Sequence, residues 1–221
     1  MRAILFPVMS SLQDDRAQVK NMTRRSIKTC TYIIAPVMMS VAFCAEPLVR
    51  LILTEKWLPC VLFLRVFCLS YICWPIITAN LNAAKAVGRS DLYLKRQLMN
   101  EAVCILLLLA TFRISVEAIA YGVLITNVVT RILDAQPSKK LIDYGYLEQM
   151  RDILPTLLLA AGAGLCMYLV IFLHLPDLLT VIIQVVVGLG IYLTGSAILE
   201  LDTFEYFKDV LAPSIRQKLK R

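Results

Sequence analysis

Long apolar stretches alternate with short polar segments along the whole chain of 221 residues. The polar segments hold most of the Lys, Arg, Asp and Glu, whereas a soluble domain would intersperse these residues with apolar ones. A helix needs about twenty apolar residues to cross the hydrocarbon core of a bilayer. The pattern therefore predicts six membrane-crossing helices, at residues 27–45, 61–79, 92–112, 116–133, 153–173 and 178–199.

An all-α fold follows from the same pattern, because an unpaired backbone group in lipid costs several kcal/mol and only helices satisfy every such group within one segment. Ala3–Leu12 is apolar but too short to cross a bilayer, so we expect it to be the end of a preceding helix. The polar residues after it form either an amphipathic helix on the membrane surface or a solvated run of charges. The expected organisation is a helix end with a surface helix at 1–26, a four-helix lobe at 27–135, a cytoplasmic loop at 136–152, a two-helix hairpin at 153–200 and a basic tail at 201–221.

The distribution of cations predicts the orientation in the membrane. Of the 23 Lys and Arg residues, only Arg50, Lys56, Arg65 and Arg113 fall on one side of the six-crossing arrangement. Lys and Arg in short loops are retained on the cytoplasmic side, so both termini are expected to be cytoplasmic. The net charge of +7 then follows from membrane topology. Because no basic surface interleaved with aromatic residues is present, we do not expect nucleic-acid binding.

The chemistry-bearing residues predict neither a metal site nor a cofactor. The seven cysteines lie mostly inside apolar stretches, without the spacing of metal ligands or of a redox pair, and are interpreted as small hydrophobic residues. Arg65 is the most unusual residue, since a cation inside a span costs about 2.5–3.5 kcal/mol on insertion scales. It either faces a cavity or a partner, or extends to the nearer membrane surface.

Six further polar residues gather towards the predicted cytoplasmic ends of the second, third and fourth crossings: Asn80, Asn82, Asn100, Glu101, Asn127 and Arg131. They either line a polar path or form hydrogen bonds between helices. The run of small residues at 160–164 is typical of close helix packing.

Three short motifs resemble a known family when taken together. They are the P-x-x-S of Pro7–Ser10 followed by Leu-Gln-Asp, the Glu-Lys-Trp-Leu-Pro of Glu55–Pro59, and the Gly-Arg-Ser-Asp of Gly88–Asp91. The chain resembles, over about residues 4–136, the second half of the polysaccharide and lipopolysaccharide flippases of the multidrug/oligosaccharidyl-lipid/polysaccharide exporter superfamily. The resemblance implies two six-helix lobes plus two helices, of which this chain would carry the end of the eighth helix and helices nine to fourteen. The first lobe would be missing, so the resemblance implies a truncated fragment.

The function implied by the resemblance is the export of a lipid-linked oligosaccharide across a bacterial inner membrane, for lipopolysaccharide or exopolysaccharide biosynthesis. The implied partners are membrane lipid, a polyprenyl-diphosphate-linked oligosaccharide and the missing lobe. Arg65 would attract the diphosphate, and the six other polar residues would line the sugar path. We do not expect an enzyme; the alternative is a membrane-embedded polysaccharide polymerase or a glycosyl- or acyltransferase, which needs carboxylates in a large loop. A membrane scaffold without transport is a third reading.

Overall fold

The computed structural model describes residues 16–173, 175–201 and 203–204, with the backbone alone at Ser90, Tyr93 and Asp134. Helices are the only regular elements among these residues, which confirms the all-α prediction. In chain order they are α2 (Arg16–Phe43), α3 (Ala45–Leu53), the 3-10 turn η1 (Glu55–Trp57), α4 (Cys60–Tyr71), α5 (Trp74–Ala86), α6 (Ser90–Thr111), α7 (Val116–Ile142), α8 (Tyr146–Leu169), the 3-10 turn η2 (Val170–Leu173) and α9 (Asp177–Ile198). The helix end expected at Ala3–Leu12 and most of the basic tail lie outside the described residues.

Five segments of the described chain are long and apolar enough to cross a membrane. They are α2, α4 together with α5, α7, α8 together with η2, and α9. Helix α6 covers the remaining predicted crossing, but Lys95, Arg96 and Glu101 make its first half too polar to meet the same criterion. The structure therefore supports a membrane protein with five candidate spans, and the count of six stays a prediction.

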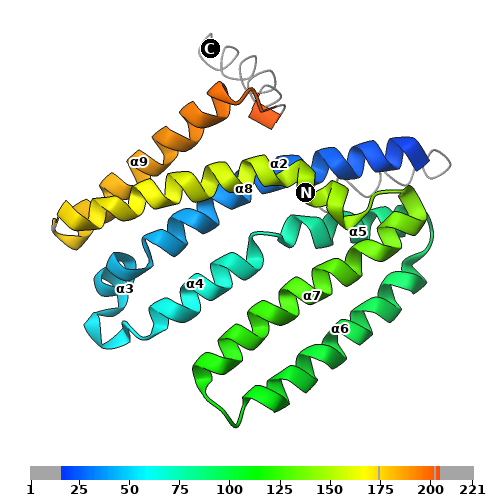
Figure 1. Cartoon of the computed structure of the whole chain (residues 1–221), viewed down its shortest axis with the longest axis horizontal. Coiled ribbons are helices and arrows are strands. Elements are labelled where there is room, and N and C mark those ends of the chain that lie inside the picture. The colour runs from blue at the N-terminus through cyan, green and yellow to red at the C-terminus, as the bar shows by residue number, and fades with distance from the viewer. Residues whose placement is uncertain (1–15, 174, 202, 205–221) are drawn as a thin grey trace, which may run out of the picture.

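The helices lie side by side in the order α6, α7, α4 with α5, α2, α8 and α9 (Figure 1). Helix α2 runs between α4 with α5 on one side and α8 on the other, so it lies in the middle of this row. Local sequence signals set several of the helix ends. Ser115 is the N-cap of α7, because its hydroxyl accepts a hydrogen bond from the Ala118 backbone N–H at 3.0 Å. Gly88 ends the turn after α5 with a φ of 73°, a conformation that glycine adopts without strain.

Three helices extend further than the pattern predicted. Helix α2 runs without a break from Arg16 to Phe43, so the expected boundary at residue 26 falls inside one helix and the polar segment is not a separate surface helix. Likewise, α7 continues to Ile142 and α8 begins at Tyr146, so the loop expected at 136–152 is reduced to residues 143–145. Charged residues in these segments form ion pairs between helices, such as Arg24 of α2 with Asp152 of α8. A charged segment therefore does not have to be a solvent-exposed loop.

The second predicted crossing is a broken helix. Helix α4 ends at Tyr71 and α5 begins at Trp74, with Pro75 in the first turn of α5. Proline has no backbone N–H and fits the first turn of a helix, where that donor would have no intrahelical partner. The proline therefore sits after the break, and the backbone groups that the break releases need other partners.

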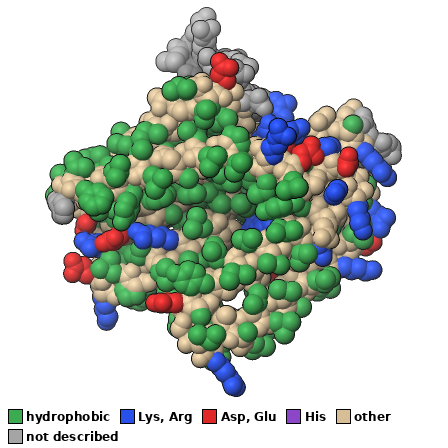
Figure 2. Space-filling view, viewed as in Figure 1, with side chains coloured by type: hydrophobic (Ala, Val, Ile, Leu, Met, Phe, Trp, Pro, Cys, Tyr) green, Lys and Arg blue, Asp and Glu red, His purple; other side chains and the backbone are tan. Residues whose placement is uncertain are grey.

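Charged side chains gather at the two ends of the bundle. Figure 2 shows many Lys and Arg side chains at the end where α2 begins and α7 meets α8, whereas apolar side chains cover much of the face in view. At the opposite end, Arg50 is paired with Glu46 at 2.8 Å on α3. The prediction likewise placed most Lys and Arg residues on one side of the membrane. Which end of the bundle faces the cytoplasm stays a prediction.

Small residues bring α8 close to its neighbours, as the run at 160–164 predicted. A Cβ atom built on Gly164 would lie 2.3 Å from the Phe43 ring of α2, and one built on Gly188 of α9 would lie 2.2 Å from Met167 of α8. Ala160 and Ala163 are buried in the same cluster as Tyr32 and Tyr192. Helices α2, α8 and α9 are therefore in direct contact through positions where a larger side chain would not fit.

Candidate functional site

Asn80 lies on α5 and forms a reciprocal pair with Gln149 on α8. The Asn80 amide donates to Gln149 Oε1 at 3.1 Å, and the Gln149 amide donates back to Asn80 Oδ1 at 3.2 Å and to the Tyr144 carbonyl at 3.0 Å. Both side chains are almost fully buried. A buried amide must find partners of this kind, because an unsatisfied one costs about 1–3 kcal/mol. Of the two readings of Asn80, the structure thus shows a hydrogen bond between helices.

Arg131 of α7 reaches the break in the second crossing. Its guanidinium Nη2 donates to the Ser70 carbonyl at 2.8 Å, and its Nε donates to the Asn127 carbonyl of its own helix at 3.3 Å. The residue is 5% exposed. Ser70 lies near the end of α4, two residues before the break, where carbonyls lose their regular helical partners. Arg131 therefore supplies a charged donor to a broken helix inside the bundle.

Arg65 lies in the first half of α4 and is only partly buried. Its Nε donates to the carbonyl of Ala42 at 3.2 Å, near the end of α2. Within the described residues, that carbonyl is the only hydrogen-bond partner of the side chain, so its two terminal nitrogens keep their donor capacity. Arg65 is thus anchored at one atom and available at two others.

The remaining predicted site residues lie on α5, α6 and α7. Asn82 is buried on α5, and Asn127 is half-buried on α7 with its carbonyl bound by Arg131. Glu101 is exposed on α6 and accepts a hydrogen bond from Gln97 at 2.7 Å, while Asn100 beside it is half-buried. None of the seven residues lines any of the three pockets described below. Their role in a sugar path stays a prediction.

A cluster of ion pairs lies between α2 and α8, and the sequence alone did not predict it. Arg24 is 2.5 Å from Asp152 and 3.9 Å from Glu148, Lys28 is 3.9 Å from Asp152, and Lys20 is 3.1 Å from Glu148. The side chain of Asp152 is only 5% exposed, so its pairing with Arg24 matters more than that of a surface pair. The spacing of these residues could have revealed the cluster. The three cations recur every four residues, as do the two carboxylates, so each set lies on one face of its helix.

Tyr144 completes this cluster from the connection between α7 and α8. Its hydroxyl donates to Asp152 Oδ2 at 2.7 Å, and its ring is fully buried. Lys20 donates to the Asp143 carbonyl at 2.6 Å and lies 5.8 Å from the centre of the Tyr144 ring. Burial, assisted by the hydrogen bond to Asp152, raises the pKa of the Tyr144 hydroxyl well above its usual range. The hydroxyl is therefore a stable donor that fixes the Asp152 carboxylate.

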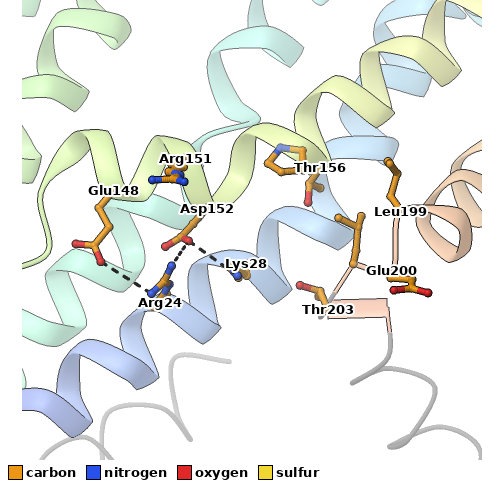
Figure 3. Close-up of a pocket in the computed structure, with 11 residues that line it drawn as sticks. Arg24, Lys28, Glu148, Arg151, Asp152, Thr156, Leu199, Glu200 and Thr203 are labelled. Carbon is orange, nitrogen blue, oxygen red and sulfur yellow. Dashed lines mark hydrogen bonds and ion pairs between the residues drawn. The ribbon is translucent and has the colours of Figure 1, made fainter.

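The α8 pocket, as we name it, lies beside this cluster. It has a volume of about 530 Å³, and its walls come from α2, the first turns of α8 and the segment after α9. Figure 3 shows Arg24 and Lys28 directed towards Glu148 and Asp152, with Leu199, Glu200 and Thr203 on another wall. The lining residues are Arg24, Lys28, Glu148, Arg151, Asp152, Pro155, Thr156, Leu199, Glu200, Leu201 and Thr203. This volume falls within the roughly 300–1,000 Å³ of small-molecule sites.

Two smaller pockets lie elsewhere on the described bundle. One of about 420 Å³ lies between the end of α7 and the start of α8, beside Lys139 and Tyr146. The other, of about 270 Å³, lies between α3 and the start of α9 at the opposite end, beside Arg50 and Asp177. No group of three or more His, Cys, Asp or Glu residues suited to a metal ion occurs in the described ranges.

Comparison with known proteins relates one part of the chain to a family. Residues 1–62 match the model of a family described as polysaccharide biosynthesis protein. No curated protein and no solved structure matches the chain. The matched residues contain two of the three motifs identified above, together with α2, α3 and η1. The match relates residues 1–62 to a polysaccharide biosynthesis family, and the five candidate spans are those of a membrane protein.

Proposed function

We propose that the protein takes part in moving a lipid-linked oligosaccharide across a membrane, for the synthesis of a surface polysaccharide such as lipopolysaccharide or exopolysaccharide. The observation that supports this most directly is the match of residues 1–62 to the polysaccharide biosynthesis family, in a chain with five candidate spans. We propose a bacterial inner membrane as the location, with both chain ends in the cytoplasm. In this proposal the chain works together with a first lobe, since flippases of this kind rock one lobe against another.

Arg65 is the residue that we propose to contact the substrate. Its two terminal nitrogens carry four N–H donors in a planar arrangement that suits phosphate oxygens, while the bond from Nε to the Ala42 carbonyl holds the guanidinium in place. Asn80 and Arg131 make contacts within the bundle and are better suited to positioning helices. The diphosphate of a polyprenyl-linked sugar is the group that Arg65 would attract.

The test measures surface polysaccharide in cells that depend on this chain, joined to the first lobe, for export. We expect Arg65→Ala to reduce export at unchanged protein level in the membrane, and Arg65→Lys to keep part of it because the charge remains. Lys56→Ala is the matched control, since Lys56 is an exposed cation near the same end of the bundle. Full export by Arg65→Ala would remove Arg65 from the mechanism.

A second measurement separates transport from catalysis. Purified membranes that contain this chain alone are supplied with lipid-linked sugar and with activated sugar or acyl donors. The proposal expects no transfer or polymerisation. Transfer by this chain would overturn the transport proposal in favour of a membrane-embedded polymerase or a glycosyl- or acyltransferase.

A further inference from the structure

The α8 pocket carries charges of both signs, and its internal ion pairs do not use all of them. Arg24 and Lys28 are engaged with Asp152, and Glu148 with Lys20 and Arg24. Arg151 and Glu200 are exposed and form no ion pair with any residue of the described ranges. Arg151 comes from α8 and Glu200 from the segment after α9, so the two unused charges stand on different walls (Figure 3).

The surroundings of the pocket are those of a lipid headgroup. The pocket lies at the end of the bundle, where α9 finishes at Ile198 and the charged first turns of α8 begin. Its lining includes the apolar Pro155, Leu199 and Leu201. The nearby faces of the spans expose apolar side chains, among them Leu158 at 64% and Ile198 at 80%. A molecule that enters the pocket with a charged group thus has apolar surface beside it for acyl chains.

We propose that the α8 pocket binds the headgroup of a zwitterionic phospholipid with a primary ammonium, phosphatidylethanolamine. Arg151, supported by the field of Arg24 and Lys28, holds the phosphate through charge-assisted hydrogen bonds. Glu200 accepts hydrogen bonds from the ammonium. A purely anionic headgroup would leave Glu200 facing a negative charge, and a choline headgroup has no N–H to donate. Pairing of both unused charges therefore favours ethanolamine over glycerol and choline headgroups.

The experiment uses the purified full chain in detergent, with native mass spectrometry and titration of phospholipids that carry identical acyl chains. We expect phosphatidylethanolamine to bind more tightly than phosphatidylcholine or phosphatidylglycerol. Arg151→Gln and Glu200→Gln should each weaken its binding by roughly tenfold, as expected for the loss of one charged hydrogen bond. The matched controls are Lys140→Gln and Glu55→Gln, two exposed charges outside the pocket, which should leave binding unchanged.

Several outcomes would overturn this proposal. Equal affinity for the three headgroups, or tighter binding of phosphatidylglycerol, would contradict recognition of the ammonium. Unchanged affinity in both pocket variants, with their thermal unfolding equal to that of the parent chain, would place the lipid elsewhere. Equal binding of soluble phosphoethanolamine would identify a small-molecule phosphate site instead. None of these measurements depends on transport, so their failure is distinct from failure of the proposed function.

Discussion

The amide pair between Asn80 and Gln149 allows a sharp test of how this bundle is held together. We replace Asn80 by Leu and Gln149 by Met, each singly and then together, because these substitutions keep approximately the volume while removing the polar atoms. Asn80 is 1% exposed and Gln149 is 0% exposed, so water cannot replace the lost partner without a change of structure.

Each single substitution has a cost that follows from the contacts. Asn80→Leu removes both hydrogen bonds of the pair and leaves the buried Gln149 Oε1 without the partner it has now. An orphaned buried acceptor costs about 1–3 kcal/mol. Gln149→Met removes the same two bonds and also the bond to the Tyr144 carbonyl, so its cost should be the larger. In the double variant both amides are absent, so the penalty for an orphaned partner is not incurred twice.

The reference is the free energy of unfolding that the double variant would have if the losses of the two single variants simply added. We expect the measured value to exceed this reference by about 1–2 kcal/mol, near the upper limit for hydrogen bonds between helices in membranes. The assay is equilibrium unfolding in mixed micelles, followed by circular dichroism. The control cycle combines Asn80→Leu with Thr194→Val, an exposed position whose hydroxyl bonds within its own helix, and should be additive within about 0.5 kcal/mol. Additivity in the Asn80 and Gln149 cycle as well would refute the reasoning that the two amides depend on each other.

Three further outcomes are expected. Gly164→Ala should destabilise the bundle by about 1–3 kcal/mol because the added methyl meets the Phe43 ring, whereas Gly162→Ala, where a Cβ meets nothing within 4 Å, should be neutral or slightly stabilising in the same unfolding assay. Arg131→Lys should fail to restore the stability lost in Arg131→Met, because a single ammonium cannot bond both carbonyls in the same geometry; equal stability of Arg131→Lys and the parent chain would contradict this. Since the pKa of Tyr144 is higher in the folded than in the unfolded chain, its contribution is complete below pH of about 10 and declines as pH rises towards the folded pKa; Tyr144→Phe should flatten this alkaline loss in a pH series of unfolding midpoints.

The positions of the helices could be read from the sequence because their signals are local. Twenty apolar residues, a serine that accepts from the third following N–H, and a glycine at positive φ each act within a few residues. The predicted boundary at residue 26 and the predicted loop at 136–152 differ from the helices of the structure, because the contacts that stabilise helix there come from residues far apart in the chain. Along the linear sequence, charged residues such as Lys20 and Asp152 suggest a segment exposed to water. In the folded chain they lie on the faces of α2 and α8 that contact each other.

The candidate site was partly predictable. Asn80 was identified because a polar residue at the end of a predicted crossing either lines a polar path or forms a hydrogen bond to another helix, but the sequence does not say to which residue. Its partner Gln149 lay in a segment interpreted as a loop, so the pair remained hidden. The same error concealed Glu148 and Asp152. The α8 pocket depends on residues from three elements far apart in the chain, and no spacing rule places Arg151 and Glu200 on the walls of one pocket.

Contacts of three kinds join α2 to α8 and α9 at successive depths. Ion pairs join Arg24 to Asp152 at one end, the Tyr32 hydroxyl donates to Ser196 at 2.9 Å farther along, and the Phe43 ring fills the space beside Gly164 near the other end. Because α2 belongs to the part that matches the polysaccharide biosynthesis family, these contacts tie the last two helices to the matched part. Any motion that separated them would break charged, polar and packed contacts together. In the transport cycle that we propose, helices α2, α8 and α9 should therefore move as one body, and the break between α4 and α5 is the better place for a hinge.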